Sequence, residues 1–308
     1  MKIGITGGAG FIGGHVAEVA ISRGHQVVTF DRLGRRPYEG YTGDVMLGDV
    51  RDDVDVCELA AHTDGIIHLA ACLGTQETIR NPRPAADTQI RGGLNFLEAC
   101  AQYDIPGVYI GVGNHWMYNT YSITKTTIER FVTMFNRERG TRVNVVRLVN
   151  AVGPRQSVAP PYGAAKVRKI GPSFICRALT GAPIEIYGDG EQVSDLVAVE
   201  DGALALVKAL EKAAEGKVFD RAVEVGTVKS HTVNDVAREV VAAAGSDSEI
   251  RHLPMRPGEI PGATVTADLS SLELVDIDPA RLCTMPEIIR NTVEWFRVNW
   301  LPGYLDRQ

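Results

Sequence analysis

The sequence lacks any apolar run near the roughly 18 residues that a membrane-spanning helix needs. It also lacks an excess of basic residues: 32 Lys and Arg stand against 38 Asp and Glu, a formal net charge of −6. A surface with this balance does not favour binding to nucleic acid or to anionic lipid. We therefore expect neither a nucleic-acid nor a membrane partner.

Cysteine is scarce as well. The five cysteines of the 308-residue chain are scattered and form no CxxC pair. This pattern argues against a disulfide framework and against a structural metal site, and it favours the reducing cytoplasm. The first residues, MKIGITGGAGFIGG, are too rich in glycine for a signal peptide and predict a strand followed by a turn.

Composition is otherwise that of a folded protein, with 44% hydrophobic and 23% charged residues. Short apolar runs alternate with helical patterns through the first half. Strands are predicted at 2–6, 26–31, 44–47, 65–71, 107–113 and 142–150, and helices at 13–23, 89–102 and 122–138. Strands that alternate with helices predict a Rossmann-type α/β fold, a doubly wound parallel sheet covered on both faces.

The pattern becomes irregular after residue 150. Residues 153–172 are rich in Pro, Gly and Ala and predict a loop, and a helix is expected at 173–180. Short strands and helices follow at 184–187, 199–213, 222–225, 233–244 and 286–299. We expect a first domain at 1–150 and a smaller, mixed α/β C-terminal domain at 151–308, with some late segments returning to the first.

Three glycines follow the first predicted strand with the spacing GxxGxxG, at Gly7, Gly10 and Gly13. Gly7 would allow a tight turn, Gly10 would let a pyrophosphate approach the backbone, and Gly13 would let the helix pack on the strand. The phosphates would bind at the positive N-terminus of that helix. The strand before and the helix after predict a dinucleotide site rather than a merely compact turn.

Asp31 lies at the end of the second predicted strand. A carboxylate there can accept both ribose hydroxyls of NAD and would repel the 2′-phosphate of NADP. Two alternatives remain: Asp31 could simply begin a turn, or Arg32, Arg35 and Arg36 could favour the phosphate. We predict NAD as the cofactor.

Seven motifs in one order resemble the extended short-chain dehydrogenase/reductase family, specifically its nucleotide-sugar epimerases and dehydratases. They cover essentially the whole chain: TGGAGFIG (6–13), GDVRD (48–52), HLAA (68–71), YSITK (121–125), RLVNAVGPRQ (147–156), IYGDGEQVSDLVAVED (186–201) and MRPGE (255–259). The resemblance implies that NAD is reduced and reoxidised within one turnover and that the substrate is an NDP-sugar, with a UDP-sugar favoured. Besides the glycines and Asp31, it implies cofactor contacts from Phe11, Ile12, Arg32, Asp49, Val50, Leu69, Ala70, Ala71, Tyr121 and Lys125.

Tyr121 and Lys125 are four residues apart at the start of a predicted helix, so they face the same side. A neighbouring ammonium lowers the pKa of a phenol, and the tyrosinate can then take a proton from a sugar hydroxyl. Tyr162 and Lys166 have the same YxxxK spacing. In the family, the Tyr–Lys pair precedes the strand that ends in RLVN, whereas Tyr162 and Lys166 follow it. Tyr162 is therefore interpreted as a substrate-loop residue or a coincidence.

The resemblance also implies substrate contacts. Asn150 would close its strand beside the sugar, and Arg256 would bind the diphosphate, for which the guanidinium fork is suited. Each has a plainer interpretation: the Asn150 amide could cap a turn, and Arg256 could be a solvated surface charge.

Two family features are missing. Gly113 stands where relatives carry a hydroxyl that hydrogen-bonds the reacting oxygen, and Ser194 stands where they commonly carry an arginine that clamps the diphosphate. Candidates to replace the hydroxyl are Cys72, Thr75, Asn114, His115 and Thr124, of which all but Thr124 are also candidates for substrate binding. Candidates to replace the arginine are Arg155, Arg168, Lys169 and Arg256.

Three functions fit this pattern. The first is an NAD-dependent NDP-sugar epimerase that transiently oxidises a C4-type hydroxyl. The second is an atypical NDP-sugar dehydratase with the same first step, although the Thr-Asp-Glu run of the usual 4,6-dehydratases is absent. The third is a non-catalytic NAD-binding regulator. In relatives, helices matching 89–102 and 122–138 form a four-helix interface, so we also expect a homodimer.

Overall fold

The computed structural model describes residues 1–256 and 259–307. The chain divides into two compact units. The first unit holds Met1–Leu148, Glu200–Val225 and Asp268–Pro279, and the second holds Val149–Val199, Gly226–Ala267 and Ala280–Gln308. Two late segments of the chain therefore belong to the first unit.

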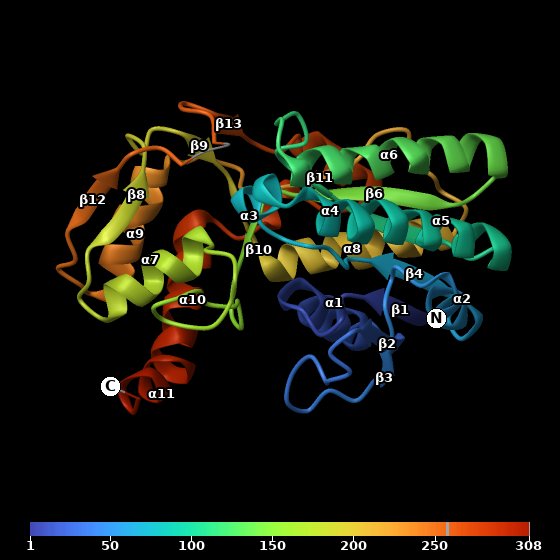
Figure 1. Cartoon of the computed structure of the whole chain (residues 1–308), viewed down its shortest axis with the longest axis horizontal. Coiled ribbons are helices and arrows are strands. Elements are labelled where there is room, and N and C mark those ends of the chain that lie inside the picture. The colour runs from blue at the N-terminus through green and yellow to red at the C-terminus, as the bar shows by residue number, and fades with distance from the viewer. Residues whose placement is uncertain (257–258, 308) are drawn as a thin grey trace. The chain divides into compact units, whose positions relative to one another are not determined.

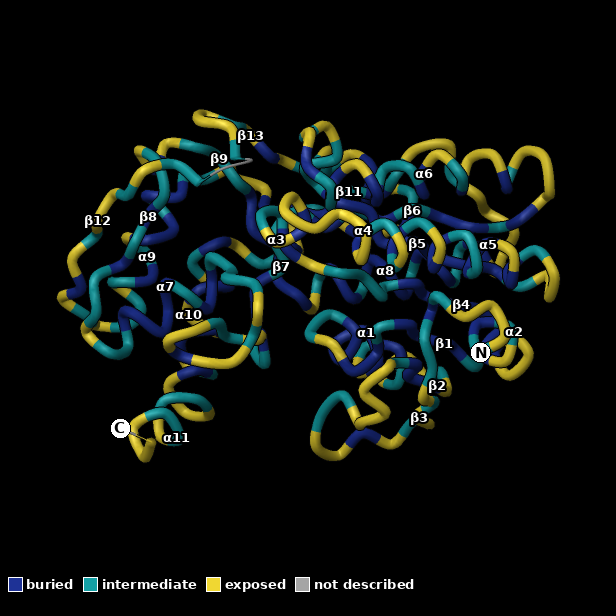
Figure 2. The backbone as a smooth tube through the Cα atoms, viewed as in Figure 1, coloured by how far each residue is buried: buried dark blue, intermediate teal, exposed yellow. Residues whose placement is uncertain are grey.

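The first unit is built on a seven-stranded sheet whose paired strands are all parallel, in the order β11-β6-β5-β4-β1-β2-β3 (Figure 1). The strands are β1 (Lys2–Thr6), β2 (Gln26–Asp31), β3 (Asp44–Leu47), β4 (Gly65–His68), β5 (Gly107–Val112), β6 (Val143–Leu148) and β11 (Val223–Val225). The Rossmann-type doubly wound sheet that the sequence predicts is confirmed. The central strands are buried along their length, as expected for a parallel sheet with both faces covered (Figure 2).

Helices cover both faces of this sheet. On one face lie α1 (Phe11–Ser22) and α8 (Val199–Ala214), joined by an ion pair between Arg23 and Glu211. On the other lie α2 (Asp53–Ala61), α5 (Gly92–Tyr103) and α6 (Thr120–Arg139), whose apolar faces meet around Leu59, Phe96 and Ile128. Two short helices, α3 (Thr75–Arg80) and α4 (Pro82–Ala86), and a π-helical turn at Asp87–Arg91 lead into α5.

The second unit is mixed α/β, as predicted. Three two-stranded parallel sheets pair β7 (Asn150–Val152) with β10 (Leu196–Ala198), β8 (Ile184–Tyr187) with β12 (Ile250–Leu253), and β9 (Val193–Ser194) with β13 (Thr264–Val265). Its helices are α7 (Ile170–Leu179), α9 (Val233–Ala244), α10 (Met285–Asn299) and α11 (Leu301–Leu305). Short 3-10 turns lie at Leu269–Val275, in the first unit, and at Pro279–Arg281. Phe174, Ile184, Val236 and Ile289 are among the buried side chains of the second unit's core.

One boundary differs from the sequence prediction in a way that matters for the site. The strand expected at 142–150 ends at Leu148, because its partner β5 ends at Val112 and the pair Val112↔Leu148 is the last of the ladder. Asn150 does not close this strand; it opens β7 in the second unit. Within the described residues, no helix is both long and apolar enough to cross a membrane.

Candidate functional site

The glycine-rich turn between β1 and α1 is closed by its own backbone. Gly7 has a φ of 69°, in the left-handed region that favours glycine, and its carbonyl accepts the N–H of Gly10 at 3.0 Å. A Cβ on Gly13 would overlap that same carbonyl oxygen. Gly10 is the N-cap residue of α1, and no side chain caps this helix end. The turn therefore presents free backbone N–H groups at a helix N-terminus, the arrangement that binds phosphate.

Asp31 lies at the end of β2, beside this turn. One carboxylate oxygen accepts the backbone N–H of Ala9 at 3.2 Å, and the other accepts that of Leu33 at 3.0 Å. Asp31 thus ties the glycine-rich turn to the end of β2 and also begins a turn of its own. The structure therefore bears out the interpretation that Asp31 begins a turn. Its contact with the ribose of NAD stays a prediction, for which a half-buried carboxylate lies beside the glycine-rich turn.

Asp49 and Val50 follow β3 at the same edge of the sheet. Arg51 binds the Asp49 carboxylate through Nε and Nη2, and this pairing lowers the pKa of Asp49. Arg32 is mostly exposed, with its Nη1 4.0 Å from Asp49. Val50 is buried, and Asp49 beside it is half-buried.

Thr6, the last residue of β1, organises the end of β4. Its hydroxyl oxygen lies 3.0 Å from Nδ1 of His68 and accepts the N–H groups of Leu69 and Ala70 at 3.1 and 3.2 Å. His68 is fully enclosed, and burial, helped by the charge of Lys125, lowers its pKa to about 3, so the imidazole is neutral. This contact fixes the HLAA segment, including the half-buried Ala71, against the glycine-rich turn.

Tyr121 and Lys125 lie one turn apart at the start of α6. Asn119 caps this helix by accepting the N–H of Ser122 at 2.9 Å. Burial lowers the pKa of Lys125 to about 7, although nearby Glu129 opposes the shift. Burial also raises the pKa of the Tyr121 hydroxyl to about 12, and neighbouring Cys72 adds to the rise.

The ammonium of Lys125 is fully buried, and within the described part of the chain its Nζ has no hydrogen-bond partner. A buried ammonium without a partner is costly and calls for a ligand. Together with the phosphate cradle, this orphaned donor fits a dinucleotide that runs from the glycine-rich turn toward α6. Phe11 and Ile12, the first residues of α1, are half-buried beside the turn.

Gln89, a residue that the sequence did not single out, connects several candidates. Its buried amide accepts the N–H of Cys72 at 3.0 Å and donates to the Cys72 carbonyl and to the Thr124 hydroxyl, both at 3.3 Å. Gln89 thereby holds Cys72 beside the helical turn of Tyr121. Thr75, the first residue of α3, is half-buried three residues further along the chain.

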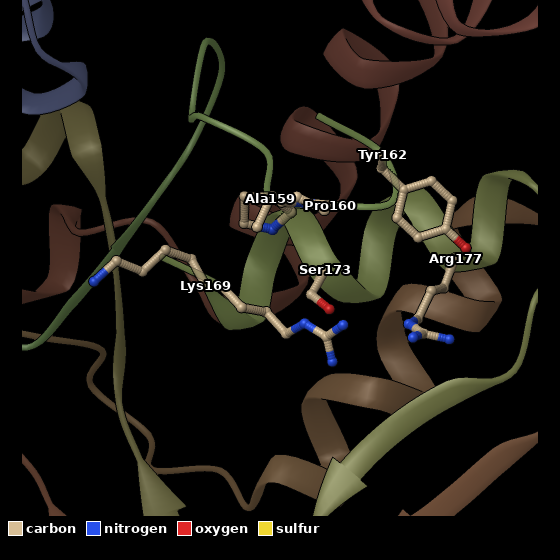
Figure 3. A pocket seen from close by; sticks show the side chains of 8 residues that line it. Ala159, Pro160, Tyr162, Lys169, Ser173 and Arg177 are labelled. Atoms are coloured by element: carbon tan, nitrogen blue, oxygen red, sulfur yellow. The ribbon is translucent and has the colours of Figure 1, made fainter. Parts of the chain in front are cut away.

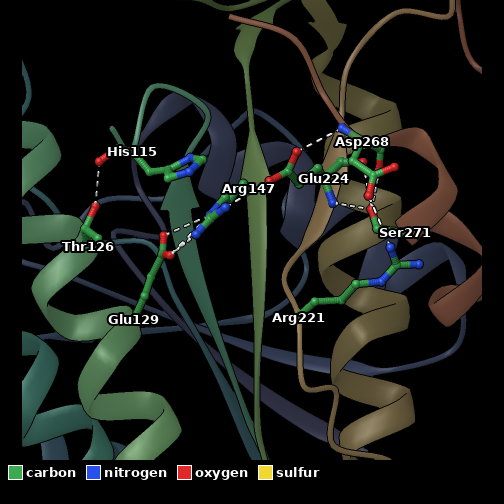
Figure 4. A network of polar contacts seen from close by, with 8 residues as sticks. All are labelled: His115, Thr126, Glu129, Arg147, Arg221, Glu224, Asp268 and Ser271. Atoms are coloured by element: carbon green, nitrogen blue, oxygen red, sulfur yellow. Dashed lines mark hydrogen bonds and ion pairs between the residues drawn. The ribbon is translucent and has the colours of Figure 1, made fainter. Parts of the chain in front are cut away.

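The loop after β5 contains Gly113, Asn114 and His115. The Asn114 amide oxygen accepts the hydroxyl proton of Ser122 at 3.3 Å, so it lies against the first turn of α6. The His115 carbonyl accepts the Thr126 hydroxyl at 3.2 Å, and the ring points toward Arg147 (Figure 4). Nδ1 of His115 is buried and has no hydrogen-bond partner within the described residues.

In the second unit, Asn150 and Ser194 lie together. The Asn150 side-chain amide donates to the Ser194 hydroxyl and to the Asp195 carbonyl, the latter at 3.3 Å. The amide therefore does not cap a following turn. Ser194 is thus a hydrogen-bond partner of Asn150.

Arg256 is not a freely solvated charge. Its guanidinium lies 4.6 Å from the centroid of the Tyr187 ring and pairs with Glu259, and its Nε is buried without a partner in the described range. At the other end of the same tyrosine, Arg168 donates to the hydroxyl at 2.9 Å. Pro257 and Gly258 of the MRPGE motif lie outside the described residues.

Figure 3 shows a hollow in the second unit with Tyr162 and Arg177 on one side and Lys169 on the other. Arg168 and Arg177 both pair with Glu185, at 3.2 and 2.6 Å. Tyr162 is buried, and its carbonyl accepts the Trp300 indole N–H at 3.4 Å, so it packs as a core residue. The hollow is lined by Ala159, Pro160, Tyr162, Arg168, Lys169, Pro172, Ser173 and Arg177.

Comparison with known proteins agrees with this geometry. The sequence model of the NAD dependent epimerase/dehydratase family matches residues 3–226. The UDP-N-acetyl-alpha-D-glucosaminuronate decarboxylase of Bacillus cytotoxicus is 27% identical over 325 aligned residues, which cover 95% of this chain and 97% of that protein.

Two solved structures share the fold across both chains. The UDP-glucose 4-epimerase of Thermotoga maritima, solved with UDP-glucose, has a TM-score of 0.85 and 28% identity, covering 96% of this chain and 99% of that one. The UDP-glucose 4-epimerase of Thermus thermophilus, in complex with NAD, has a TM-score of 0.83 and 28% identity, covering 97% and 100%. Since the family match spans well over half of the sequence, the chain belongs to the NAD dependent epimerase/dehydratase family, the nucleotide-sugar branch of the extended short-chain dehydrogenases/reductases, and is an NAD-dependent enzyme.

Proposed function

We propose that the protein is an NDP-sugar epimerase that transiently oxidises the C4 hydroxyl of a UDP-sugar, with Tyr121 as the base. The observation that carries this proposal is the buried, unpartnered ammonium of Lys125 one helical turn from Tyr121. Such a group lowers stability, so it is expected where chemistry uses its charge. The similarity to two UDP-glucose 4-epimerases supports the choice of substrate.

Tyr121 must lose its proton to act as a base, and its pKa of about 12 in the free protein keeps it protonated at neutral pH. Lys125 has a pKa of about 7, so its charge is available near neutrality, and that charge favours tyrosinate. NAD, when bound, supplies a hydride acceptor that returns the hydride within the turnover, and a positive charge that also favours the ionised phenol. Tyr121 would take the proton of the sugar hydroxyl as the carbonyl forms and return it when hydride adds to the opposite face.

We propose candidate substrate contacts in each of the two units, taken separately. In the first unit, Cys72 lies beside Tyr121, and Asn114 lies against the same helical turn. Thr75 and His115 lie in the segments that follow them. In the second unit, Asn150 and Arg256 occupy the positions that match the family's substrate residues, and Arg168, which shares the Tyr187 side chain with Arg256, adds a second cation.

A dehydratase is the second candidate, because elimination can start from the same C4 oxidation and the family model includes both activities. The absence of the Thr-Asp-Glu run favours the epimerase. A non-catalytic NAD-binding regulator, the third function considered from the sequence, is set aside, because the family is one of enzymes and the chain retains Tyr121 and Lys125.

The test is mass spectrometry of the purified protein incubated with NAD and a panel of UDP- and dTDP-sugars. An epimerase leaves the mass of the sugar nucleotide unchanged and alters its chromatographic retention, whereas a dehydratase product is lighter by one water. Loss of the product with Tyr121→Phe would identify the site. No conversion of any of these sugars by protein that binds NAD would contradict both proposed activities.

We also propose a homodimer formed through α5 and α6, since α6 carries the exposed apolar residues Ile123 and Met134. Sedimentation of the protein at micromolar concentration, alone and with Met134→Glu, tests this. A wild-type mass equal to the 33.3 kDa of one chain would contradict it.

A further inference from the structure

Glu129 lies one helical turn beyond Lys125 on the same face of α6. Its side chain is 8% exposed. The carboxylate accepts hydrogen bonds from Nε and Nη2 of Arg147, on β6, the latter at 2.5 Å. Gly111 on β5 makes room for this carboxylate, because a Cβ there would overlap Oε1 of Glu129. Arg147 and the space at Gly111 therefore fix the position of the Glu129 carboxylate one helical turn from Lys125.

Arg147 serves a second carboxylate. Its Nη1 donates to Oε1 of Glu224, on β11, at 2.9 Å (Figure 4). Glu224 is itself anchored, since its Oε2 accepts the N–H of Asp268 at 2.9 Å and its own N–H donates to Ser271 at 2.7 Å. Two carboxylates thus share one guanidinium, and the group of Glu129, Arg147 and Glu224, called here the acid–arginine triad, keeps one negative charge in excess.

Within the acid–arginine triad, Glu129 is the acid whose negative charge raises the pKa of Lys125 against the effect of burial. His68, on β4, is neutral, and Tyr109, on β5, offers a ring whose hydroxyl stays protonated because burial raises its pKa. The buried thiol of Cys100, on α5, is likewise held neutral by a raised pKa, and Tyr103 of α5 is exposed. The charged side chains on α3, α4, the π-helical turn and α5 are all exposed: Glu77, Arg80, Arg83, Asp87, Arg91 and Glu98.

We propose that the excess negative charge of the acid–arginine triad keeps Lys125 protonated, so that Glu129 and Glu224 are positioning residues for the Tyr121–Lys125 pair. Glu129 acts on the ammonium directly. Glu224 acts through Arg147: without its charge, Arg147 and Glu129 form a neutral pair, and Lys125 loses most of the field that opposes its burial. This inference rests on the roles that the proposed function gives to Tyr121 and Lys125.

The direct test is a pH titration of Lys125 in the full-length protein, free of NAD, by NMR of ¹³C-labelled lysine side chains. Lys125→Met identifies the resonance. We expect Glu224→Gln to lower the titration midpoint of Lys125 by at least about 0.5 pH unit, and Glu129→Gln to lower it further. Glu224→Asp keeps the charge and should titrate like the wild type.

Glu273→Gln is the matched control. Glu273 is an exposed acid on the neighbouring Leu269–Val275 segment, paired with Arg221 at 3.0 Å and separate from the acid–arginine triad. The same loss of charge there should leave the Lys125 midpoint unchanged. Thermal denaturation of each variant identifies any that fail to fold, and either triad variant alone is enough for the test.

A Lys125 midpoint that stays at the wild-type value in either Glu224→Gln or Glu129→Gln, measured on folded protein, would overturn the inference. So would an equal shift in Glu273→Gln. These results are independent of the proposed function, which fails instead if Tyr121→Phe turns over normally. With both proposals correct, Glu224→Gln also lowers kcat/KM at pH 7, by about twofold for a half-unit shift, because a smaller fraction of Lys125 then carries the charge that favours tyrosinate.

Discussion

The ammonium nitrogen of Lys125 lies 4.4 Å from the centroid of the Tyr109 ring. The cation therefore contacts the electron-rich face of the ring, and it has no hydrogen-bond partner among the described residues. A desolvated cation–π contact is worth about 2 kcal/mol or more. Tyr109 therefore favours the charged lysine, where burial alone would favour the neutral form.

Replacing the ring tests this contact. Tyr109→Phe keeps the aromatic face and loses only the long 3.4 Å hydrogen bond to the Lys125 carbonyl, so we expect kcat to stay within about threefold of the wild type. Tyr109→Leu removes the face, and we expect a Lys125 midpoint clearly lower than in the Phe variant, measured by the same lysine NMR. Equal midpoints in the two variants would show that the ring does not bind the cation.

Tyr121→Phe should lower kcat by at least about 100-fold, the usual loss when a general base is removed. NAD binding should survive, because the glycine-rich turn and Asp31 are untouched. Tyr162→Phe is the matched control, since Tyr162 packs in the core of the second unit and should be nearly silent. Steady-state turnover and NAD titration of both variants test this prediction. Normal turnover by Tyr121→Phe together with loss of turnover in Tyr162→Phe would place the site around the later YxxxK segment.

Asp31 should set the choice of cofactor. We expect NAD to bind at least tenfold more tightly than NADP, a difference of about 1.4 kcal/mol. Asp31→Asn should narrow this ratio by removing the repulsion between the carboxylate and the 2′-phosphate of NADP. Calorimetric titration with both dinucleotides measures the ratio; equal or tighter NADP binding by the wild type would assign the arginines after Asp31 to the phosphate.

Two neighbouring glycines of α1 offer a sharp comparison. Gly13→Ala places a methyl group onto the Gly7 carbonyl, so we expect a lower melting temperature and weaker NAD binding. Gly14→Ala meets only ordinary contacts, 3.4 Å or more from Pro37, and should hold or raise stability, since alanine favours a helix by up to about 1 kcal/mol. Differential scanning fluorimetry with and without NAD distinguishes them; similar losses in both variants would refute a specific role for Gly13.

Lys125 should also leave a signature in stability. Its folded pKa of about 7 lies below its usual value, so between pH 7 and that value the unfolded chain binds a proton that the folded chain does not. Wild-type stability therefore gains with pH across this window, and Lys125→Met loses that gain. Urea unfolding at several pH values should show that the Lys125→Met variant is more stable than the wild type below pH 7. The free energies of unfolding of the two proteins should converge in alkaline solution. Parallel curves would mean that Lys125 is not held at a lowered pKa.

The sequence predicts the parts of the site that local pattern encodes. The strand, the glycine spacing and the following helix are close in the chain, so the roles of Gly7 and Gly13 follow from the order of residues alone. The YxxxK spacing places Tyr121 and Lys125 on one face of any helix. Most strands of the central sheet are predictable because they are short segments rich in apolar and β-branched residues.

The contacts that the sequence does not reveal are those between residues far apart in the chain. In the sequence, Gln89 is an ordinary polar residue of a predicted helix, yet its side chain hydrogen-bonds both Cys72 and Thr124. Thr6 reads as the last residue of a strand, yet its hydroxyl fixes the end of β4. The sequence predicts the wrong element for Asn150, because nothing in the run RLVN marks where the ladder with β5 stops.

The late return of the chain to the first unit has a consequence for biosynthesis. β11 pairs with β6 and completes one edge of the seven-stranded sheet, and Glu224 on β11 supplies the second carboxylate for Arg147. Until the ribosome has added these residues, nascent β6 presents an open edge, and Arg147 lacks its second carboxylate. The nucleotide-binding fold thus reaches its final form only after most of the polypeptide has emerged from the exit tunnel.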